Sequence, residues 1–264
     1  MSEEEYDYKY QTAFERMGLR VGKRVKNATE PTAPNSTVTA PTVVEEAKPV
    51  DTHVSTPAQT DTLTTDFITI KGKQYDPLTC EEGVIINGVK WATRNVDKPG
   101  TFATKPEDAG MFYQWNRKIG WSATDPIVNS NGVPTWDGSS SSGATWESAN
   151  DPSPAGWRVP TLDEIQKLLD INKVSSEWTT ENGIIAGRKF TDRASGNSLF
   201  LPAAGGRHGS NGMVYGACDY GLYWSSTVYE AGYSYGLYFG YINAVTDWWN
   251  HRRDFGLRVR PVAK

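Results

Sequence analysis

The chain has 264 residues and a formal net charge of −4 at pH 7. This acidic balance argues against a nucleic-acid-binding protein, because there is no basic excess to neutralise phosphates, and no apolar run is long enough for a membrane span. Ten Trp and thirteen Tyr are a high aromatic load, typical of an aromatic core or of an exposed recognition surface.

The first ten residues, MSEEEYDYKY, are acidic where a secretory signal is basic and then apolar, so we expect no export signal. Cys80 and Cys218 give neither a disulfide framework nor a metal-ligand spacing. We expect two separate thiols, although a pair could form outside a cell.

Residues 1–20 are predicted to form a short amphipathic helix, which begins with a capping box of Ser2 and Glu5. Its apolar stripe, at helical spacing, consists of Tyr6, Tyr10, Phe14 and Met17. A lone helix of this length is marginal in water, so the stripe is expected to dock on a partner, either the folded domain or another structural protein.

Residues 21–65 are predicted to be a disordered linker. From Asn27 onward they are mostly Pro, Thr, Ala, Val, Ser and Glu, a composition that buries too little apolar surface to offset the entropy of ordering. Pro and Thr keep such a chain rather extended. The predicted organisation is therefore a docking helix, a tether, and a folded domain over residues 66–264.

The first half of this domain contains strand and loop signals. Residues 84–91 carry β-branched residues around an Asn-Gly pair, which predicts a hairpin. Residues 109–115, AGMFYQW, are apolar, and periodicity leaves open whether they form a strand or a short helix. Residues 121–150 are rich in Ser, Gly, Asn and Pro and are predicted to be a long loop. Three tryptophans are expected to anchor it to the body of the domain: Trp121, Trp136 and Trp146.

Residues 151–170 contain the clearest local signals in the chain. Three turn residues precede a short extended segment at 157–159, and Pro160 ends that segment. Thr161 and Glu164 then form a capping box. The helix that follows has one apolar face, made by Leu162, Ile165, Leu168 and Leu169. A buried helix is predicted here, and a core strand is predicted at 199–201.

The C-terminal third is predicted to hold three strands, over residues 222–227, 235–242 and 255–262. Too many aromatic and polar residues lie between them for all to be core, and their composition resembles that of an antibody paratope. We expect a ligand-binding face formed by Tyr229, Tyr233, Tyr235, Tyr241, Asn243, Asp247, Trp248, Trp249, Asn250 and His251. His251 precedes two arginines and is expected on the surface.

Six segments occur in an order that resembles the Fibrobacter succinogenes major paralogous domain family, which is similar to the wider C-type lectin-like fold. They are IINGVKWATRNV (85–96), AGMFYQWN (109–116), NDPSPAGWRVPTLDEIQKLL (150–169), LPAAGGRHGSNG (201–212), YWSST (223–227) and FGLRVRPV (255–262). The resemblance implies an α+β, C-type lectin-like domain with a twisted mixed sheet, two short helices and long loops. Within it, Gly205 to Gly209 are expected to form a glycine-rich turn, and Trp157, Arg158 and Trp224 to lie in the core.

This chain departs from the family at two positions. The family often has Cys where this chain has Ser153, and Cys again where it has Pro261. The resemblance implies a family disulfide whose two ends are missing together here. Such a joint loss is expected for a protein that folds in a reducing cytoplasm.

The chemistry of related proteins is not evident in this chain. Calcium-dependent sugar binding in C-type lectins uses Glu-Pro-Asn or Gln-Pro-Asp followed by Trp-Asn-Asp, whereas here Trp249 and Asn250 precede His251. The enzyme relatives use a cysteine pair near the C-terminus, and this chain has only Cys218 there. We therefore expect no catalytic residue, metal or cofactor, and a formylglycine-generating type of oxidase is the least favoured alternative.

The favoured hypothesis is a non-enzymatic recognition or display module that binds a glycan or a surface protein of a host. Without an export signal, such a domain reaches the outside after synthesis in a host cytoplasm if it belongs to a phage virion, where the N-terminal arm would attach it to a head or tail fibre. The alternative is a bacterial cell-surface or envelope protein of the same family. A homo-oligomer is left open, since no heptads support a trimeric fibre.

Overall fold

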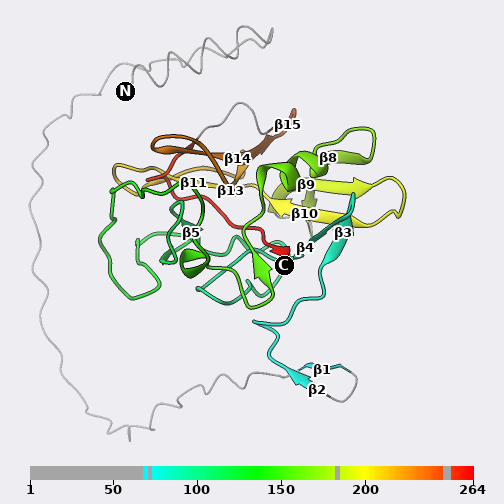
Figure 1. Cartoon of the computed structure of the whole chain (residues 1–264), viewed down its shortest axis with the longest axis horizontal. Helices are drawn as coiled ribbons and strands as arrows, with labels where there is room; N and C mark the ends of the chain where they lie inside the picture. Colours follow the sequence, from blue (N-terminus) through cyan, green and yellow to red (C-terminus); the bar gives the residue numbers. More distant parts are fainter. Residues whose placement is uncertain (1–67, 71–72, 182–184, 246–250) are drawn as a thin grey trace, which may run out of the picture. The chain divides into compact units, whose positions relative to one another are not determined.

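Figure 1 shows the computed structural model, which describes residues 68–70, 73–181, 185–245 and 251–264. These residues form a mainly β fold with one α-helix, α2 (Leu162–Leu168), and one turn of 3-10 helix (Ser148–Asn150). The predicted docking helix, residues 1–20, and the whole of the predicted linker, residues 21–65, lie outside the described residues.

The strands are short at the beginning of the domain and longer toward its C-terminal third. They are β1 (Ile68–Ile70), β2 (Lys73–Tyr75), β3 (Val84–Ile86), β4 (Val89–Trp91), β5 (Phe112–Tyr113), β6 (Gly120–Trp121), β7 (Trp157–Arg158), β8 (Val174–Glu181), β9 (Ile185–Asp192), β10 (Ser198–Pro202), β11 (Ala204–Arg207), β12 (Val214–Ala217), β13 (Tyr220–Glu230), β14 (Tyr233–Gly240), β15 (Ala244–Val245), β16 (His251–Arg252) and β17 (Val262–Ala263).

The largest sheet has the order β12-β11-β13-β14-β15, with β16 also paired to β14. It is a mixed sheet, because β11 and β13 are parallel while the other pairs are antiparallel. The β13–β14 hairpin is its centre, and both strands are visibly curved (Figure 1). Bulges between Trp224 and Glu230 account for part of this curvature, since an extra residue bends a strand and increases its twist.

Smaller sheets surround this ribbon. The order β3-β4-β17-β7 places the last strand of the chain between two early ones, and β10-β9-β8 forms a separate antiparallel sheet. The hairpin predicted at 84–91 is confirmed, with Asn87 at φ 44° and Gly88 at φ 77°. Both central residues of the turn have positive φ, which explains why the Asn-Gly pair marks this position.

The helix predicted after Pro160 is confirmed as α2, together with its capping box. Thr161 Oγ1 accepts a hydrogen bond from the Glu164 backbone N–H, and the Glu164 carboxylate accepts one from the Thr161 N–H at 2.8 Å. Arg158 adds an ion pair to Glu164 at 2.6 Å. Arg158 is only half-buried, whereas Trp157 and Trp224 lie in the core as expected. The segment is tied to β13, because the Leu162 N–H donates to Thr227 Oγ1 at 3.0 Å.

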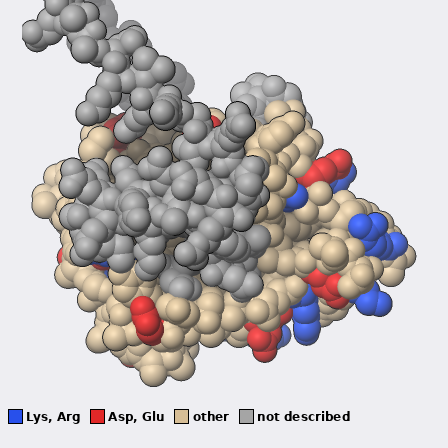
Figure 2. Space-filling model, turned by 90° about the horizontal axis from the view of Figure 1, so that it is seen from above, with Lys and Arg blue, Asp and Glu red and all other residues tan. Residues whose placement is uncertain are grey.

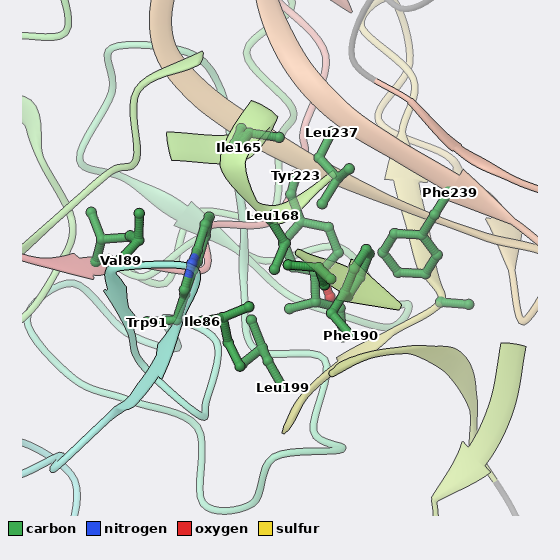
Figure 3. Packing of buried hydrophobic residues seen from close by; sticks show 14 residues of the cluster. Ile86, Val89, Trp91, Ile165, Leu168, Phe190, Leu199, Tyr223, Leu237 and Phe239 are labelled. Atoms are coloured by element: carbon green, nitrogen blue, oxygen red, sulfur yellow. The ribbon is translucent and has the colours of Figure 1, made fainter. Parts of the chain in front are cut away.

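Two apolar clusters lie on opposite faces of the β13–β14 hairpin. On one face, Tyr223 and Phe239 pack with α2 and with β3, β4, β9 and β10 (Figure 3). On the other, Leu222 and Trp224 pack with the segments around Tyr113 and Leu257. Successive residues of a strand point to opposite faces. The hairpin is therefore buried on both sides along most of its length, and the predicted core strand at 199–201 joins the first cluster as part of β10.

Three predictions about the fold are wrong in part. Only one short α-helix occurs in the described part of the chain, where two were expected. Of the turn expected at Gly205–Gly209, residues 205–207 instead belong to β11 (Ala204–Arg207), and a turn begins only at Gly209. Residues 255–262 were predicted to be one strand, but only β17 at their end is regular. The rest forms single bridges to Tyr113, Arg207 and Tyr223, because it runs between separate segments instead of along one partner strand.

Candidate recognition surface

The predicted ligand-binding residues lie at both ends of β14. Four of them, Asp247, Trp248, Trp249 and Asn250, fall outside the described residues. The others form two groups: Tyr229, Tyr233 and Tyr235 at the tip of the β13–β14 hairpin, and Tyr241 and Asn243 just after β14. Six residues separate Tyr235 from Tyr241, which corresponds to about 20 Å along an extended chain. The predicted face is therefore two surfaces.

At the hairpin tip, Tyr229 and Tyr235 form an edge-to-face pair with ring centroids 5.2 Å apart. Tyr229 is 45% exposed and Tyr235 is half-buried. The turn between the strands, at Ala231 and Gly232, is tight, and Gly232 has φ +80°. The tip therefore presents tyrosine rings on a short, well-defined hairpin, and such rings provide contact area at a low entropic cost.

His251 is not part of the exposed surface, so its expected surface position is wrong. Its side chain is only 5% exposed and lies with its ring edge-on to Trp224, with centroids 5.8 Å apart. Burial lowers the pKa of His251 to about 3. The physical reason is the alternation of β16: His251 pairs with Ser234 and points inward, while the next residue, Arg252, is exposed.

Arg253 is a buried residue whose guanidinium donates hydrogen bonds to the hairpin tip, and no pattern in the sequence predicted this role. Its guanidinium is buried and lies 4.1 Å from the centroid of the Trp115 ring. It donates to Ser234 Oγ at 3.1 Å and to the Gly143 carbonyl at 2.9 Å. Longer bonds of 3.4 Å reach the carbonyls of Glu230 and Tyr233, on either side of the turn. One side chain thus connects the hairpin tip to the loop that contains Gly143.

That loop, Ser139–Thr145, is exposed except at Ser141, which is half-buried. Its start is held by Arg117, which donates to Ser139 Oγ at 2.6 Å and is ion-paired with Asp137. Hydrogen bonds from Ser139, followed by the pairing with Arg117, lower the pKa of Asp137 to about 2. We use the name hairpin-tip surface for Tyr229–Tyr235 together with this serine loop.

The tryptophan anchors predicted for residues 121–150 are confirmed in position. Trp121 and Trp146 are buried, and Trp136 is half-buried with its indole N–H donating to the Gly209 carbonyl at 2.7 Å. Trp146 packs against Trp115, with ring centroids 5.5 Å apart. Trp121 and Trp136 pack against each other, with ring centroids 4.7 Å apart, while Trp146 packs separately on Trp115. The serine loop between Trp136 and Trp146 is therefore held at both ends.

The hairpin-tip region carries little charge, and its basic residues are engaged: Arg252 forms an ion pair with Asp254, and Arg253 is buried beneath the turn. From Gly209 to Thr246 the only charged residues are Asp219 and Glu230. Figure 2 shows that most Lys and Arg side chains on the visible face gather toward one end, the end that carries β8 to β10 in Figure 1. A surface made mostly of Tyr, Ser and Gly favours shape and hydrogen bonding over charge as the basis of recognition.

The described residues include two thiols and a shallow cavity. They hold no group of three or more His, Cys, Asp or Glu side chains placed to share a metal ion. Cys80 and Cys218 are both free thiols. A shallow cavity of about 350 Å³ is lined by residues 97–98, 103–104, 108–111 and 122–123, but the hydroxyl of Ser122 is engaged within its own loop. No helix in the described residues is long and apolar enough to cross a membrane.

Comparisons with protein-family models, with curated protein sequences and with solved structures found no match. The site is therefore interpreted from its own geometry. That geometry consists of a pair of tyrosine rings, one exposed and one half-buried, a serine-rich loop that is held at both ends, and one buried arginine that connects the turn to the loop.

Proposed function

We propose that this chain is a non-enzymatic recognition module that binds a glycan or a protein on the surface of a host through the hairpin-tip surface. The observation that carries the proposal is the link made by Arg253 between the turn at Glu230–Tyr233 and the carbonyl of Gly143. A binding surface made of two loops works best when the loops are held in a fixed relation before the partner arrives.

The residue types of this surface support the proposal. Tyr gives a large, rigid contact area with a polar hydroxyl, and Ser and Gly give adaptable hydrogen bonding, a combination typical of antibody paratopes. Tyr229 is exposed beside exposed Glu230 and Ala231, and four of the seven residues Ser139–Thr145 are serines. Because most exposed polar groups here are Tyr and Ser hydroxyls, hydrogen bonding to a glycan or to a protein surface is the expected mode of recognition.

The family resemblance extends the proposal to the whole chain. We propose a C-type lectin-like domain of the Fibrobacter succinogenes major paralogous domain type, supported by a mixed central sheet, a capped helix and long anchored loops. As a component of a phage virion, the domain would be exposed to the host, and residues 1–20 would attach it to a structural protein. A bacterial cell-surface protein of the same family is the alternative location.

The recognition role is tested by attachment of the fluorescently labelled full chain to cells of the host bacterium. The double variant Tyr229→Ala/Tyr235→Ala and the single variant Ala231→Arg are expected to reduce attachment about tenfold or more, as for central residues of an interface. Ile171→Ser, which changes an exposed apolar residue outside the hairpin-tip surface, serves as the matched control. Attachment by both tip variants at the level of the control would contradict the proposal.

The tether role is tested separately. A chain that lacks residues 1–65 is expected to lose its place in the parent particle while still attaching to host cells. If the shortened chain still assembles into the particle, the arm is not the attachment point, and the recognition role of the hairpin-tip surface remains open to its own test.

A further inference from the structure

We infer that the opposite end of the β13–β14 ribbon carries a second binding site, for a neutral saccharide, formed by Tyr220, Tyr238 and Asp219. This site is separate from the hairpin-tip surface and does not depend on the function proposed for it. It lies where β13 begins and β14 ends, since Tyr220 pairs with Gly240.

The first argument is a row of aromatic rings across three strands. Tyr238 of β14 lies diagonally opposite Tyr220 of β13, with ring centroids 5.6 Å apart and planes tilted by 42°. Tyr215 of β12 continues the row, with its ring centroid 6.1 Å from that of Tyr220. All three rings are half-buried and pack on the apolar cluster around Leu222 and Trp224, so part of each ring stays at the surface.

The second argument is that glycines hold these rings in place. Gly216 has φ +64°, and a Cβ there would lie only 1.9 Å from Cζ of Tyr220. A Cβ on Gly206 would lie 2.8 Å from the hydroxyl of Tyr215. The rings therefore occupy the space that side chains would fill, and they lie against the backbone of neighbouring strands. Such a platform is formed before any ligand arrives, which lowers the entropic cost of binding.

The third argument is a pair of polar groups at the edge of the platform. Within the described parts of the chain, neither the Tyr220 hydroxyl nor the Asp219 carboxylate has a hydrogen-bond partner, and Asp219 is exposed. Burial, followed by the neighbouring Tyr238 and then by the charge of Asp219, raises the pKa of Tyr220, and burial followed by Asp219 raises the pKa of Tyr238. The phenols therefore stay protonated as hydrogen-bond donors, and Asp219 directly precedes Tyr220 in the chain.

The chemistry of these groups selects the ligand class. A sugar presents C–H groups on one ring face, which pack on the electron-rich face of a tyrosine, and hydroxyls that both donate and accept hydrogen bonds. Asp219 is the acceptor and Tyr220 the donor. From Gly209 to Thr246 the sequence has no Lys or Arg, and Arg188, which reaches this end of β14, is buried and donates to the Gly240 carbonyl at 3.0 Å. The exposed charge beside the rings is the carboxylate of Asp219, which disfavours an anionic glycan or a phosphate. A cationic ligand is usually enclosed by several aromatic faces with space between them. Tyr220 and Tyr238 are in contact, with ring centroids 5.6 Å apart, and leave no such space between their rings.

The test is calorimetric titration of the full chain with neutral hexasaccharides of β-1,4-glucose, β-1,3-glucose and β-1,4-mannose. An α-1,4-galacturonate hexamer and hexalysine are the charged comparisons. At least one neutral ligand is expected to bind, and the galacturonate is expected not to. Tyr220→Phe and Asp219→Asn, which remove one polar group without changing the shape much, should each weaken binding about tenfold.

Ile171→Ser is the control, because it alters an exposed apolar residue outside both surfaces and should leave saccharide binding unchanged. The proposal is overturned if none of the three neutral ligands binds, or if binding is insensitive to both Tyr220→Phe and Asp219→Asn. Binding of hexalysine that depends on Asp219, in place of the neutral ligands, would also overturn it and would assign the site to a cationic peptide. A loss of host attachment without a loss of saccharide binding would concern the hairpin-tip surface alone.

Discussion

Replacing His251 by Asn is expected to flatten the dependence of stability on pH between pH 7 and pH 5. In the folded protein, burial against Trp224 lowers the pKa of His251 from 6.5 to about 3, so the imidazole stays neutral. In the unfolded chain it gains a proton below about pH 6.5. The stabilisation is therefore fully present above that pH and is lost as the pH falls toward 3.

The size of this effect follows from the two pKa values. One pKa unit corresponds to about 1.4 kcal/mol, so protonation of the unfolded chain lowers the free energy of unfolding by about 2 kcal/mol between pH 7 and pH 5. Carboxylates act at lower pH. Burial tends to raise the pKa of Glu81, but hydrogen bonds from Arg94 and Gly83 outweigh it and the pKa is lowered from 4.5. The pH 5 to 7 window thus reports mainly on histidine.

The measurement is urea unfolding followed by tryptophan fluorescence at half-unit steps from pH 5 to pH 7. His251→Asn lowers stability at every pH because it leaves a cavity beside Trp224, so the slope against pH is compared, and not the absolute stability. Leu168→Ala, which leaves a cavity but removes no titrating group, should keep the slope of the unmodified protein. If His251→Asn also keeps that slope, His251 is not buried in the neutral form and the placement of β16 is wrong.

Three further predictions concern the framework. Leu168→Ala removes a fully buried side chain of α2 and should lower the free energy of unfolding by about 2–5 kcal/mol in urea titrations. Thr161→Ala removes the N-cap of α2 and should cost about 1 kcal/mol in the same assay, while Asp163→Ala, in the same turn but exposed, should cost less. Arg253→Lys keeps the charge but cannot reach Ser234, Gly143 and Glu230 together. It should increase hydrogen exchange at Ser139–Thr145 and at the hairpin turn, and unchanged protection there would contradict the linking role.

Elements with local signals could be predicted from the sequence. The hairpin at 84–91 follows from Asn87 and Gly88, which both adopt the positive φ that their turn requires. The start of α2 follows from Thr161 and Glu164, whose mutual hydrogen bonds satisfy backbone N–H groups of the first turn. The tryptophans of the long loop follow from their isolation among Ser, Gly and Asn. For the hairpin and for α2, the decisive interactions join residues only a few positions apart. For the tryptophans, the large apolar side chain is expected to be buried whatever its neighbours are.

Elements that depend on distant partners could not be predicted in this way. His251 lies next to Arg252 and Arg253, which suggests a solvent-exposed segment, yet its burial depends on Trp224 and on pairing with Ser234. The segment before β17 alternates apolar residues with Arg258 and Arg260, a pattern typical of a strand with one polar face. Both arginines are instead 1% exposed, because carbonyls far away in the sequence accept their hydrogen bonds.

Buried arginines explain how a domain with so little regular structure holds its loops. Four of them, Arg207, Arg253, Arg258 and Arg260, are at most 3% exposed. Their guanidinium groups donate to carbonyls of long loops, among them those of Thr124, Gly143, Gly110 and Pro106. A loop carbonyl buried without a partner would be costly, and one guanidinium offers five donors.

This way of anchoring has a cost and a consequence. Burial removes water from the guanidinium groups and disfavours their charged form, which lowers the pKa of Arg258 to about 9 and that of Arg260 to about 10. However, the acceptors are backbone carbonyls, which every residue possesses. The side chains of the serine loop can therefore change without losing the bond from Arg253 to Gly143. A fold anchored through the backbone can present different side chains on the same loops, and this property suits a surface that has to match a partner.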